Sequence, residues 1–396
     1  VNGNQSNNRV NYQYDERDLV LKSILAEGDD DQSSSLYDYD TNRNLTKKTI
    51  GLEDSKPRVY QTIFDGYDRA VALNDPMGND ATFNYDANNN VVTRLARGEQ
   101  LDGVGNTGNI RLYETSISYD PLDRQVREEK SFFDTATQVA IADGLSIQQT
   151  FYSDNSQVVK QLDDNNHQVL IAYDTANRGK TLTDHKNNSV SYGYDANSNV
   201  VILTEVEKSD LGSADETFVT TFAYDNLDRL NRKIDNAANT YEYAYDSRNN
   251  KTVFIDALRP NNAIDPGNIT RYQYDGVNRL IASTRSLTND GTGSGVSSGL
   301  ITTTQQWDDS SRLTAQGDDN GNNTEYSYDA LNRKVNTTYA DNSEHQYSYD
   351  VHHNVVNMVD ANGSVVTSNF DLLNRISSRS ITPGTNVAND TRFENY

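Results

Sequence analysis

The sequence predicts an all-β protein in which tandem β-hairpin repeats form one long antiparallel sheet that coils or spirals. Three observations predict this fold class. A Tyr-Asp motif recurs along the 396 residues, turn-forming residues lie midway between its copies, and only 34% of the residues are hydrophobic. A regular short period is typical of repeat architectures, and so little apolar material cannot build one large core.

The repeated motif consists of an aromatic residue, any residue and Tyr-Asp, followed after a short variable stretch by Asn-Arg, Asp-Arg or Asn-Val and an apolar residue. YQYDGVNRLI at Tyr272 and YSYDALNRKV at Tyr326 are clear copies. Seven of the gaps between successive motif aspartates are 20 or 21 residues, so 20–21 is the base period. We interpret residues 1–396 as a single array of about 15 repeats that belongs to a longer chain. The motif aspartates are Asp15, Asp40, Asp65, Asp86, Asp120, Asp154, Asp174, Asp195, Asp225, Asp246, Asp275, Asp308, Asp329, Asp350 and Asp371.

A second turn divides each short repeat, so that one repeat reads strand, turn, strand, turn. Examples are Asp163-Asp-Asn-Asn and Asp318-Asp-Asn-Gly. Asp, Asn and Gly tolerate a left-handed backbone, and strands of about 5–6 residues fit the period. Fifteen repeats imply on the order of 30 strands, and open twisted sheets seldom exceed about 10 strands without curling or splitting. The sheet must therefore coil, spiral or stack.

Each motif residue has a predicted structural role. Tyrosines two apart on a strand share a face, so neighbouring repeats would form an aromatic ladder worth about 0.2–1 kcal/mol per pair. The Asp carboxylate would accept backbone N–H groups in the turn, and the following Arg would pair with a nearby Asp, contributing about 0–1 kcal/mol and setting the register. These motif residues are Tyr85, Asp86, Tyr119, Asp120, Tyr173, Asp174, Arg178, Tyr194, Asp195, Tyr224, Asp225, Arg229, Tyr245, Asp246, Tyr274, Asp275, Arg279, Tyr328, Asp329, Arg333, Tyr349, Asp350, Asp371 and Arg375.

Five insertions lengthen the array, and they lie near 94–114, 129–149, 204–217, 255–270 and 284–303. They are predicted to form longer strands or surface loops, which is where repeat proteins usually carry binding. The last contains a glycine-rich run from Gly291 to Gly299. This run lacks the Lys-Ser/Thr of a phosphate-binding loop, so we expect a flexible loop.

Composition excludes several classes of function. The formal net charge of −23 makes nucleic acid and anionic membranes poor partners. No cysteine is present, which excludes disulfides and thiolate chemistry, and no apolar run approaches the roughly 18 residues of a membrane span. The mean hydropathy is −0.81, yet 25 Tyr and 10 Phe argue against disorder.

The Tyr-Asp pattern and its 20–21-residue period resemble the YD repeat, also called the RHS repeat, from Tyr14 to Arg375. The resemblance implies a β-sheet that spirals into a hollow shell. In polymorphic toxins and insecticidal toxin complexes such shells enclose a toxic C-terminal domain, and in wall-associated bacterial proteins and animal teneurins similar repeats form extracellular scaffolds. By this resemblance we expect a non-catalytic scaffold of a secreted or surface-exposed bacterial protein that encloses, displays or delivers cargo.

The chain departs from the toxin pattern at its ends. No toxin-like segment and no DPxG-type self-cleavage region follow the repeats; Asn74-Asp-Pro-Met-Gly78 has those letters but is predicted to be an ordinary turn. Both ends lack caps, and residues 391–396 resemble the start of a further repeat. The expected partners are therefore further repeats or copies of the same chain, besides an enclosed cargo domain and glycans.

Three alternatives to the shell remain open. Edge strands at Tyr12 and Phe393 would pair between copies in a head-to-tail filament or surface adhesin, since contacts that do not close propagate. Exposed Tyr and Asn side chains suit glycan binding. A polysaccharide lyase would use Tyr and His as acid and base, with His352 or His353 as candidates, although a charge of −23 repels acidic glycans.

Candidate metal ligands are few, and no catalytic, cofactor or dedicated metal site is expected. His167 and His185 lie in mid-repeat turns one period apart, so a shared ligand pair is the alternative to our favoured interpretation as surface turn residues. The clusters Asp29-Asp30-Asp31 and Asp163-Asp164 lack a complete calcium loop. Weak Ca²⁺ binding at acidic turns is the remaining cofactor hypothesis.

Overall fold

The computed structural model describes residues 9–100, 108–209, 212–256, 268–289, 296–384 and the backbone of 393–395. These residues form 31 β-strands and no α-helix, and all the strands belong to one sheet. Strands that are consecutive in the sequence pair antiparallel, as in β16–β17, β17–β18 and β18–β19. The predicted all-β antiparallel fold is confirmed. None of the described residues forms a helix with the length and apolarity of a membrane span.

The chain divides into two compact units. Unit 1 comprises Val1–Ser146, Gln306–Gln316 and Asn322–Tyr396, and unit 2 comprises Ile147–Gln305 and Gly317–Gly321. Three strands span the boundaries of these units: β11 (Ala140–Tyr152), β23 (Ser297–Trp307) and β24 (Leu313–Gly317).

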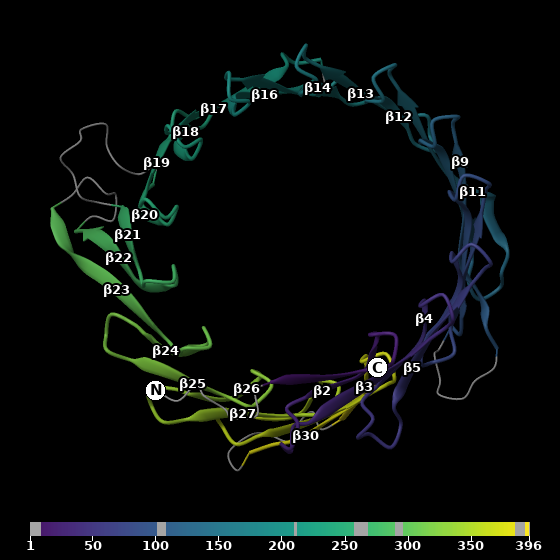
Figure 1. The fold of residues 1–396 in the computed structure, drawn as a ribbon. Helices are drawn as coiled ribbons and strands as arrows, with labels where there is room; N and C mark the ends of the chain where they lie inside the picture. The colour runs from purple at the N-terminus through teal and green to yellow at the C-terminus, as the bar shows by residue number, and fades with distance from the viewer. Residues whose placement is uncertain are drawn as a thin grey trace. The chain divides into compact units, whose positions relative to one another are not determined.

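Unit 1 combines the strands from both ends of the chain (Figure 1). Its early strands are β1 (Val10–Tyr14), β2 (Val20–Leu25), β3 (Ser33–Tyr39), β4 (Leu45–Ile50), β5 (Arg58–Phe64), β6 (Ala70–Asn74), β7 (Asp80–Tyr85), β8 (Val91–Gly98), β9 (Ile110–Tyr119) and β10 (Gln125–Phe133). Its late strands are β25 (Asn323–Tyr328), β26 (Lys334–Thr338), β27 (Glu344–Tyr349), β28 (Val355–Val359), β29 (Val365–Phe370), β30 (Ile376–Thr382) and β31 (Phe393–Asn395).

Unit 2 is a continuous run of hairpins from the middle of the chain. Its strands are β12 (Val158–Leu162), β13 (Gln168–Tyr173), β14 (Gly179–Thr183), β15 (Ser189–Tyr194), β16 (Val200–Glu207), β17 (Glu216–Tyr224), β18 (Leu230–Ile234), β19 (Thr240–Tyr245), β20 (Lys251–Ile255), β21 (Ile269–Tyr274) and β22 (Leu280–Thr288).

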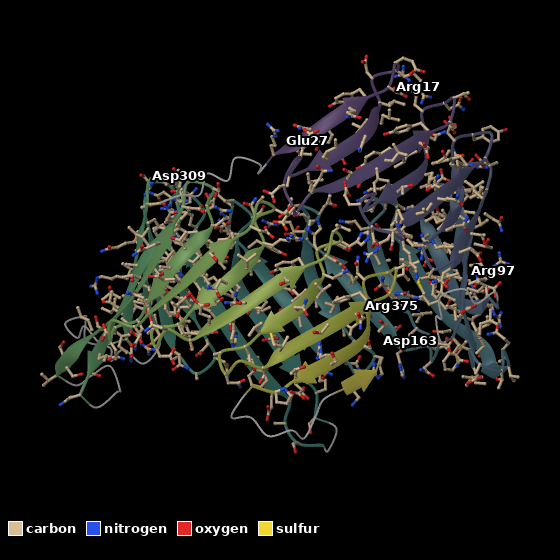
Figure 2. All side chains as sticks on the ribbon, turned by 90° about the horizontal axis from the view of Figure 1, so that it is seen from below. Arg17, Glu27, Arg97, Asp163, Asp309 and Arg375 are labelled. Atoms are coloured by element: carbon tan, nitrogen blue, oxygen red, sulfur yellow. The ribbon has the colours of Figure 1, made fainter. Side chains whose placement is uncertain are left out.

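The turns lie in two rows, one on each edge of the sheet. Because every strand reverses direction, the Tyr-Asp turns fall on one edge and the mid-repeat turns on the opposite edge. Figure 2 shows this for β2, which has Arg17 in the Tyr-Asp turn at one end and Glu27 in the other turn at the opposite end. Consecutive turns on the same edge are therefore neighbours in the sheet.

The Tyr-Asp turn has a constant backbone geometry, which Asp225 illustrates. The Asp225 N–H donates to the Arg229 carbonyl at 2.9 Å, the Asp228 N–H donates to the Asp225 carbonyl at 3.0 Å, and Asp228 has φ of 59°. Tyr224 pairs with Leu230, after which the register shifts by one residue. Such a turn needs a residue that tolerates positive φ, so Asn or Asp usually occupies this position.

One position of the predicted series is wrong. The turn between β11 and β12 begins at Ser153, whose N–H donates to the Gln157 carbonyl at 2.8 Å, and not at Asp154. The Ser153 hydroxyl accepts the Gln157 N–H at 3.2 Å, as the motif aspartate does in other turns. Asp154 is the aspartate next to this position, and both Ser153 and Asp154 fit the period of 20–21 residues before Asp174.

The inserted segments mostly lengthen strands. β11 has 13 residues, β23 has 11 and β9 has 10, whereas most strands of the short repeats have 5 or 6. Gly291 lies outside the described residues, and Gly299 lies within β23.

The described part of the chain has few buried apolar side chains. They are Ile24, Ala26, Ile117, Ile269 and Ala330. More of the buried side chains are small and polar, including Ser33, Ser34 and Ser35 in β3. The sheet is therefore held mainly by strand pairing and by the polar contacts of its turns.

Candidate functional site

The aspartate of each Tyr-Asp turn organises the backbone around it. Asp225 Oδ1 accepts the N–H groups of Leu227 at 2.9 Å and Arg229 at 3.1 Å. Its Oδ2 accepts the Arg229 Nε–H at 2.8 Å. This side-chain hydrogen bond from Arg229 is the largest cause that lowers the pKa of Asp225 below its ordinary value. The carboxylate thus links both ends of the turn.

The same contact recurs through the predicted motif residues. Where the fourth residue after Asp is Arg, the pairs are Asp65–Arg69, Asp120–Arg124, Asp174–Arg178, Asp225–Arg229, Asp275–Arg279, Asp308–Arg312, Asp329–Arg333 and Asp371–Arg375. Where it is Asn, the amide replaces the guanidinium, as in Asp86–Asn90, Asp195–Asn199, Asp246–Asn250 and Asp350–Asn354.

Arginine and tyrosine also link each repeat to the next one. Arg229 Nη1 donates to the Asp246 carbonyl at 2.8 Å, and its guanidinium lies 4.8 Å from the centre of the Tyr245 ring. In return, the Tyr245 hydroxyl donates to the Leu230 carbonyl at 2.9 Å. Adjacent Tyr-Asp turns are therefore joined by two hydrogen bonds and a cation–π contact. The hydroxyls of Tyr85, Tyr119, Tyr173, Tyr194, Tyr224, Tyr274, Tyr328 and Tyr349 each donate to a carbonyl of the preceding repeat.

The predicted ladder, in which tyrosine rings of neighbouring repeats contact each other, is wrong for Tyr326 and Tyr347, because a lysine lies between these two rings. Lys334 Nζ is 5.4 Å from the ring centre of Tyr326 and 5.2 Å from that of Tyr347. The equivalent tyrosines of successive repeats are separated by an intervening strand, or roughly 9–10 Å, which exceeds the roughly 4.5–7 Å of aromatic pairs. At this point of the sheet, a cation therefore takes the place of a direct contact between the two tyrosine rings.

Unit 1 contains contacts between segments about 300 residues apart, and we call them the seam. The seam joins the turns 26–32 and 51–57 of the early repeats to the Tyr-Asp turns 329–333, 350–354 and 371–375 of the late repeats. In Figure 1, β2 and β3 accordingly lie in the same region as β26 and β27, and the contacts between them run through their turns. The mid-repeat edge of early hairpins thus meets the Tyr-Asp edge of late hairpins, so this part of the sheet coils back onto itself.

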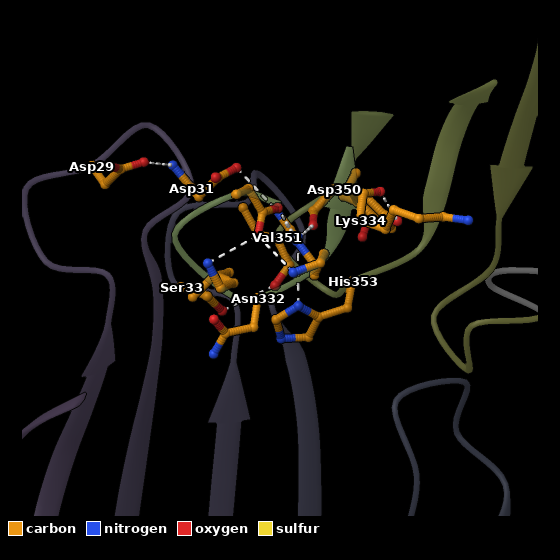
Figure 3. Close-up of polar contacts among 12 residues, drawn as sticks. Asp29, Asp31, Ser33, Asn332, Lys334, Asp350, Val351 and His353 are labelled. Carbon is orange, nitrogen blue, oxygen red and sulfur yellow. Dashed lines mark hydrogen bonds and ion pairs between the residues drawn. The ribbon is translucent and has the colours of Figure 1, made fainter. Parts of the chain in front are cut away.

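Polar groups from both edges pair across the seam (Figure 3). Arg333 Nη2 and Asp31 Oδ1 are 2.8 Å apart, and the Ser33 hydroxyl donates to the Val351 carbonyl at 2.9 Å. Arg58, which is only 4% exposed, donates to the Asn374 side chain. Burial is the largest influence on Asp31 and raises its pKa.

His352 fills the centre of the seam. Its side chain is 3% exposed, and its Nε2 lies 3.2 Å from Asp54 Oδ2. Gly51 faces the ring with φ of +73°, and a Cβ atom at this position would overlap the imidazole. Burial and the positive charge of Arg58 lower the pKa of His352. The ring is therefore a packed group at the centre of the seam.

Sequence reasoning missed the seam. Asp31, Gly51, Asp54 and Arg58 lie outside the Tyr-Asp motif, and each has its seam partner roughly 300 residues away. His352 lies at a turn position where other copies of the motif carry unrelated residues, so the motif assigns it no role. A single sequence holds no signal that would pair these positions.

Neither candidate of the lyase hypothesis lies in an open cleft. His352 is buried in the seam, and His353 Nδ1 faces Arg333 Nη1 at 3.4 Å. A Tyr–His contact does occur between Tyr339 and His345, with 3.3 Å between the hydroxyl and Nδ1. Tyr339 is exposed at the start of the turn before β27, and His345 is half-buried in β27. A surface pocket of about 370 Å³ in unit 2 is lined by Leu182, Glu205 and Phe218 among others, and no histidine lines it.

Carboxylates of the acidic clusters accept hydrogen bonds from backbone N–H groups of the protein. Asp29 Oδ1 accepts the Asp31 N–H at 3.1 Å, and Asp164 Oδ1 accepts the Ile147 N–H at 3.0 Å. Among the described residues, no three His, Asp or Glu side chains gather as a metal-binding group. His167 and His185 do come together, with their ring centres 4.1 Å apart.

The DPxG letters belong to an ordinary hairpin turn, as predicted. Asp75 Oδ1 accepts the N–H groups of Met77 at 2.8 Å and Asn79 at 3.0 Å, and Gly78 has φ of +92°. This turn joins β6 to β7.

Comparison with known proteins identifies the repeat. The family model described as RHS Repeat matches residues 307–344. The Photorhabdus luminescens Tc holotoxin pore, in a form with a TccC3 mutation, is 14% identical with a TM-score of 0.50, over 96% of this chain and 22% of that chain. The crystal structure of TcdB2-TccC3-TEV is 13% identical with a TM-score of 0.46, over 97% of this chain and 24% of that chain. This chain thus spans about a quarter of their length; the search of curated proteins gave no match.

Proposed function

We propose that this chain, of which residues 307–344 match the RHS repeat, is a non-catalytic scaffold, a section of the wall of a hollow shell that encloses, displays or delivers a cargo. The seam is the observation that carries this proposal. A wall that encloses a space must close against itself, and the seam supplies such a contact between early and late repeats of unit 1.

The contacts within the wall favour a rigid container. Each Tyr-Asp turn is joined to the next by the Arg guanidinium and the Tyr hydroxyl, so that repeats hold their neighbours through side chains as well as strand pairing. Stability in such arrays is approximately a sum of repeat and nearest-neighbour terms. A wall of this kind gains strength with each added repeat and needs no apolar core.

The partners and location of the shell follow from the same proposal. The likeness in fold to the Tc holotoxin pore supports further shell segments and an enclosed protein cargo as partners. We place the protein outside the cell, as a secreted or surface-exposed bacterial protein. Its net charge of −23 disfavours nucleic acid and anionic membranes.

Negative-stain electron microscopy of the purified protein tests the proposal. We expect discrete particles with a curved or closed wall around a stain-filled space. Long fibres with a regular axial repeat would overturn it and favour the filament, in which the edge strands β1 and β31 pair between copies.

A further inference from the structure

We propose that His167 and His185 form a binding site for a transition-metal ion such as Zn²⁺, with the two imidazoles as its protein ligands. Both residues lie in unit 2 on the mid-repeat edge of the sheet. His167 ends the turn between β12 and β13, and His185 lies in the turn between β14 and β15, so the two turns are neighbours on this edge. The strand pairing that fixes these hairpins also brings the rings together.

The two imidazoles lie close enough to share an ion after one ring rotates. The ring centres are 4.1 Å apart and the ring planes differ by 27°, so the rings are stacked. Two nitrogens that bind one zinc ion at about 2.0–2.1 Å are at most about 4 Å apart, and both lone pairs must point at the ion, which stacked rings do not provide. Because the His167 side chain is 49% exposed, it can rotate and turn a ring nitrogen toward an ion shared with His185 without moving the backbone.

Asp163 prepares His167 as a ligand. Its Oδ2 lies 3.1 Å from His167 Nδ1, and its Oδ1 is fixed by the N–H groups of Asn165 at 2.9 Å and His167 at 2.8 Å. A carboxylate that accepts the Nδ1–H leaves the Nε2 lone pair free, which is the arrangement commonly found behind metal-ligating histidines. Imidazole is a preferred donor for Zn²⁺, Cu²⁺ and Ni²⁺.

The turn itself does not require histidine at position 167. Asn occupies the equivalent position in other mid-repeat turns, for example where Asn79, Asn188 and Asn239 donate to the turn aspartate at 2.8, 2.8 and 2.9 Å. The imidazole of His167 therefore adds a donor atom that the fold does not need. With two protein ligands, water or a side chain from another molecule completes the coordination.

The chain offers a low background for measuring this site. It has five histidines and no cysteine. Of the other three histidines, His352 is buried in the seam, His353 faces Arg333 and His345 faces Tyr339. Binding that depends on both His167 and His185 is thus readily distinguished from other binding.

Isothermal titration of the full chain with Zn²⁺, using protein purified without a polyhistidine tag, tests the site. We expect one ion per chain, at least about tenfold weaker binding in both His167→Asn and His185→Asn, and unchanged binding in the control His345→Asn. Zn²⁺ should also raise the Tm of the wild type and not of the two variants, because a ligand that binds only the folded state stabilises it.

The proposal is overturned if the wild type binds no Zn²⁺, or if either variant binds it as the wild type does. His167→Asn keeps the turn because Asn is the residue of the neighbouring turns; if it fails to fold, His185→Asn still decides the result. The site is independent of the shell proposal, which rests on the repeats and the seam.

Discussion

At the scale of the residue, three side chains account for the recurrence of the motif. The aspartate accepts donors from both ends of its turn, the arginine holds that aspartate and reaches the next turn, and the tyrosine hydroxyl donates back to the preceding repeat. A change at any of the three therefore disturbs two repeats. This explains why the same residue types recur where so little apolar surface is buried.

Tyrosine hydroxyls should contribute measurably to stability. Tyr349→Phe removes the hydrogen bond to the Lys334 carbonyl, 2.7 Å long, and should lower the free energy of unfolding by about 0.5–1.5 kcal/mol. Tyr67→Phe is the matched control because this residue is 80% exposed. Urea denaturation compares the two variants, and equal losses would contradict the proposed role of the hydroxyl.

Acid should destabilise the array through its turn aspartates. Hydrogen bonds within the turns hold the pKa values of Asp65, Asp120 and Asp225 below their ordinary value, with the Arg side chain as the largest cause. A carboxyl group whose folded pKa is depressed stabilises the fold above the unfolded pKa of about 3.9, and this stability is lost as pH falls through the folded pKa. Thermal melting at constant ionic strength should show Tm falling below about pH 4. A Tm that stays constant between pH 6 and pH 2 would argue against it.

The motif sequence identified the turns but not all the contacts of its residues. Asp and Asn at turn positions follow from local backbone chemistry, so turns were predictable. The partner of each tyrosine depends on which strand lies beside it, and the cation of the intervening strand takes the place that the sequence had assigned to another ring. Ser153 was missed because a hydroxyl can replace the carboxylate that defines the motif.

At the scale of the element, the hairpins serve two kinds of contact. Within the sheet, each hairpin pairs with the next through backbone hydrogen bonds. At the seam, whole turns meet edge to edge, and small or buried groups such as Gly51 and His352 allow the close approach. Sequence periodicity predicts the pairing of hairpins, because this contact repeats along the chain. It does not predict the contacts at the seam, because each of them occurs only once.

The close packing of Gly51 against the His352 ring can be tested by comparing Gly51 with Gly28, a turn glycine of similar backbone geometry. Gly51→Ala should destabilise unit 1 more than Gly28→Ala does. Both glycines have positive φ, 73° and 81°, so both variants carry backbone strain of about 1–2 kcal/mol, but a Cβ meets the His352 ring at Gly51 and no atom within 4 Å at Gly28.

Urea denaturation of both variants separates strain from steric overlap. Adding His352→Ala to Gly51→Ala should recover part of the loss, because the smaller side chain leaves room for the new methyl group. Equal effects of the two glycine variants would show that the seam is not packed at this position.

At the scale of the whole molecule, the period and composition predicted the fold class, the strand count and the need for the sheet to coil. The described residues form 31 strands of one sheet with few buried apolar side chains, which agrees with the predicted fold class. The place where the sheet meets itself was not predictable, because its residues come from non-repeating positions about 300 residues apart. The candidate metal pair was visible as two histidines in turns one period apart, and only strand pairing shows that their rings meet.

The central claim is that early and late repeats of one chain meet at the seam, and thiol cross-linking tests it most directly. The natural chain has no cysteine, so Asp31→Cys with Arg333→Cys provides a unique pair at positions whose side chains are 2.8 Å apart. After treatment with a short bifunctional thiol reagent, mass spectrometry of the monomer should find the peptides of residues 31 and 333 joined, and each single-cysteine variant should give no such product. Absence of this product, or joined peptides only between separate chains, would contradict the claim.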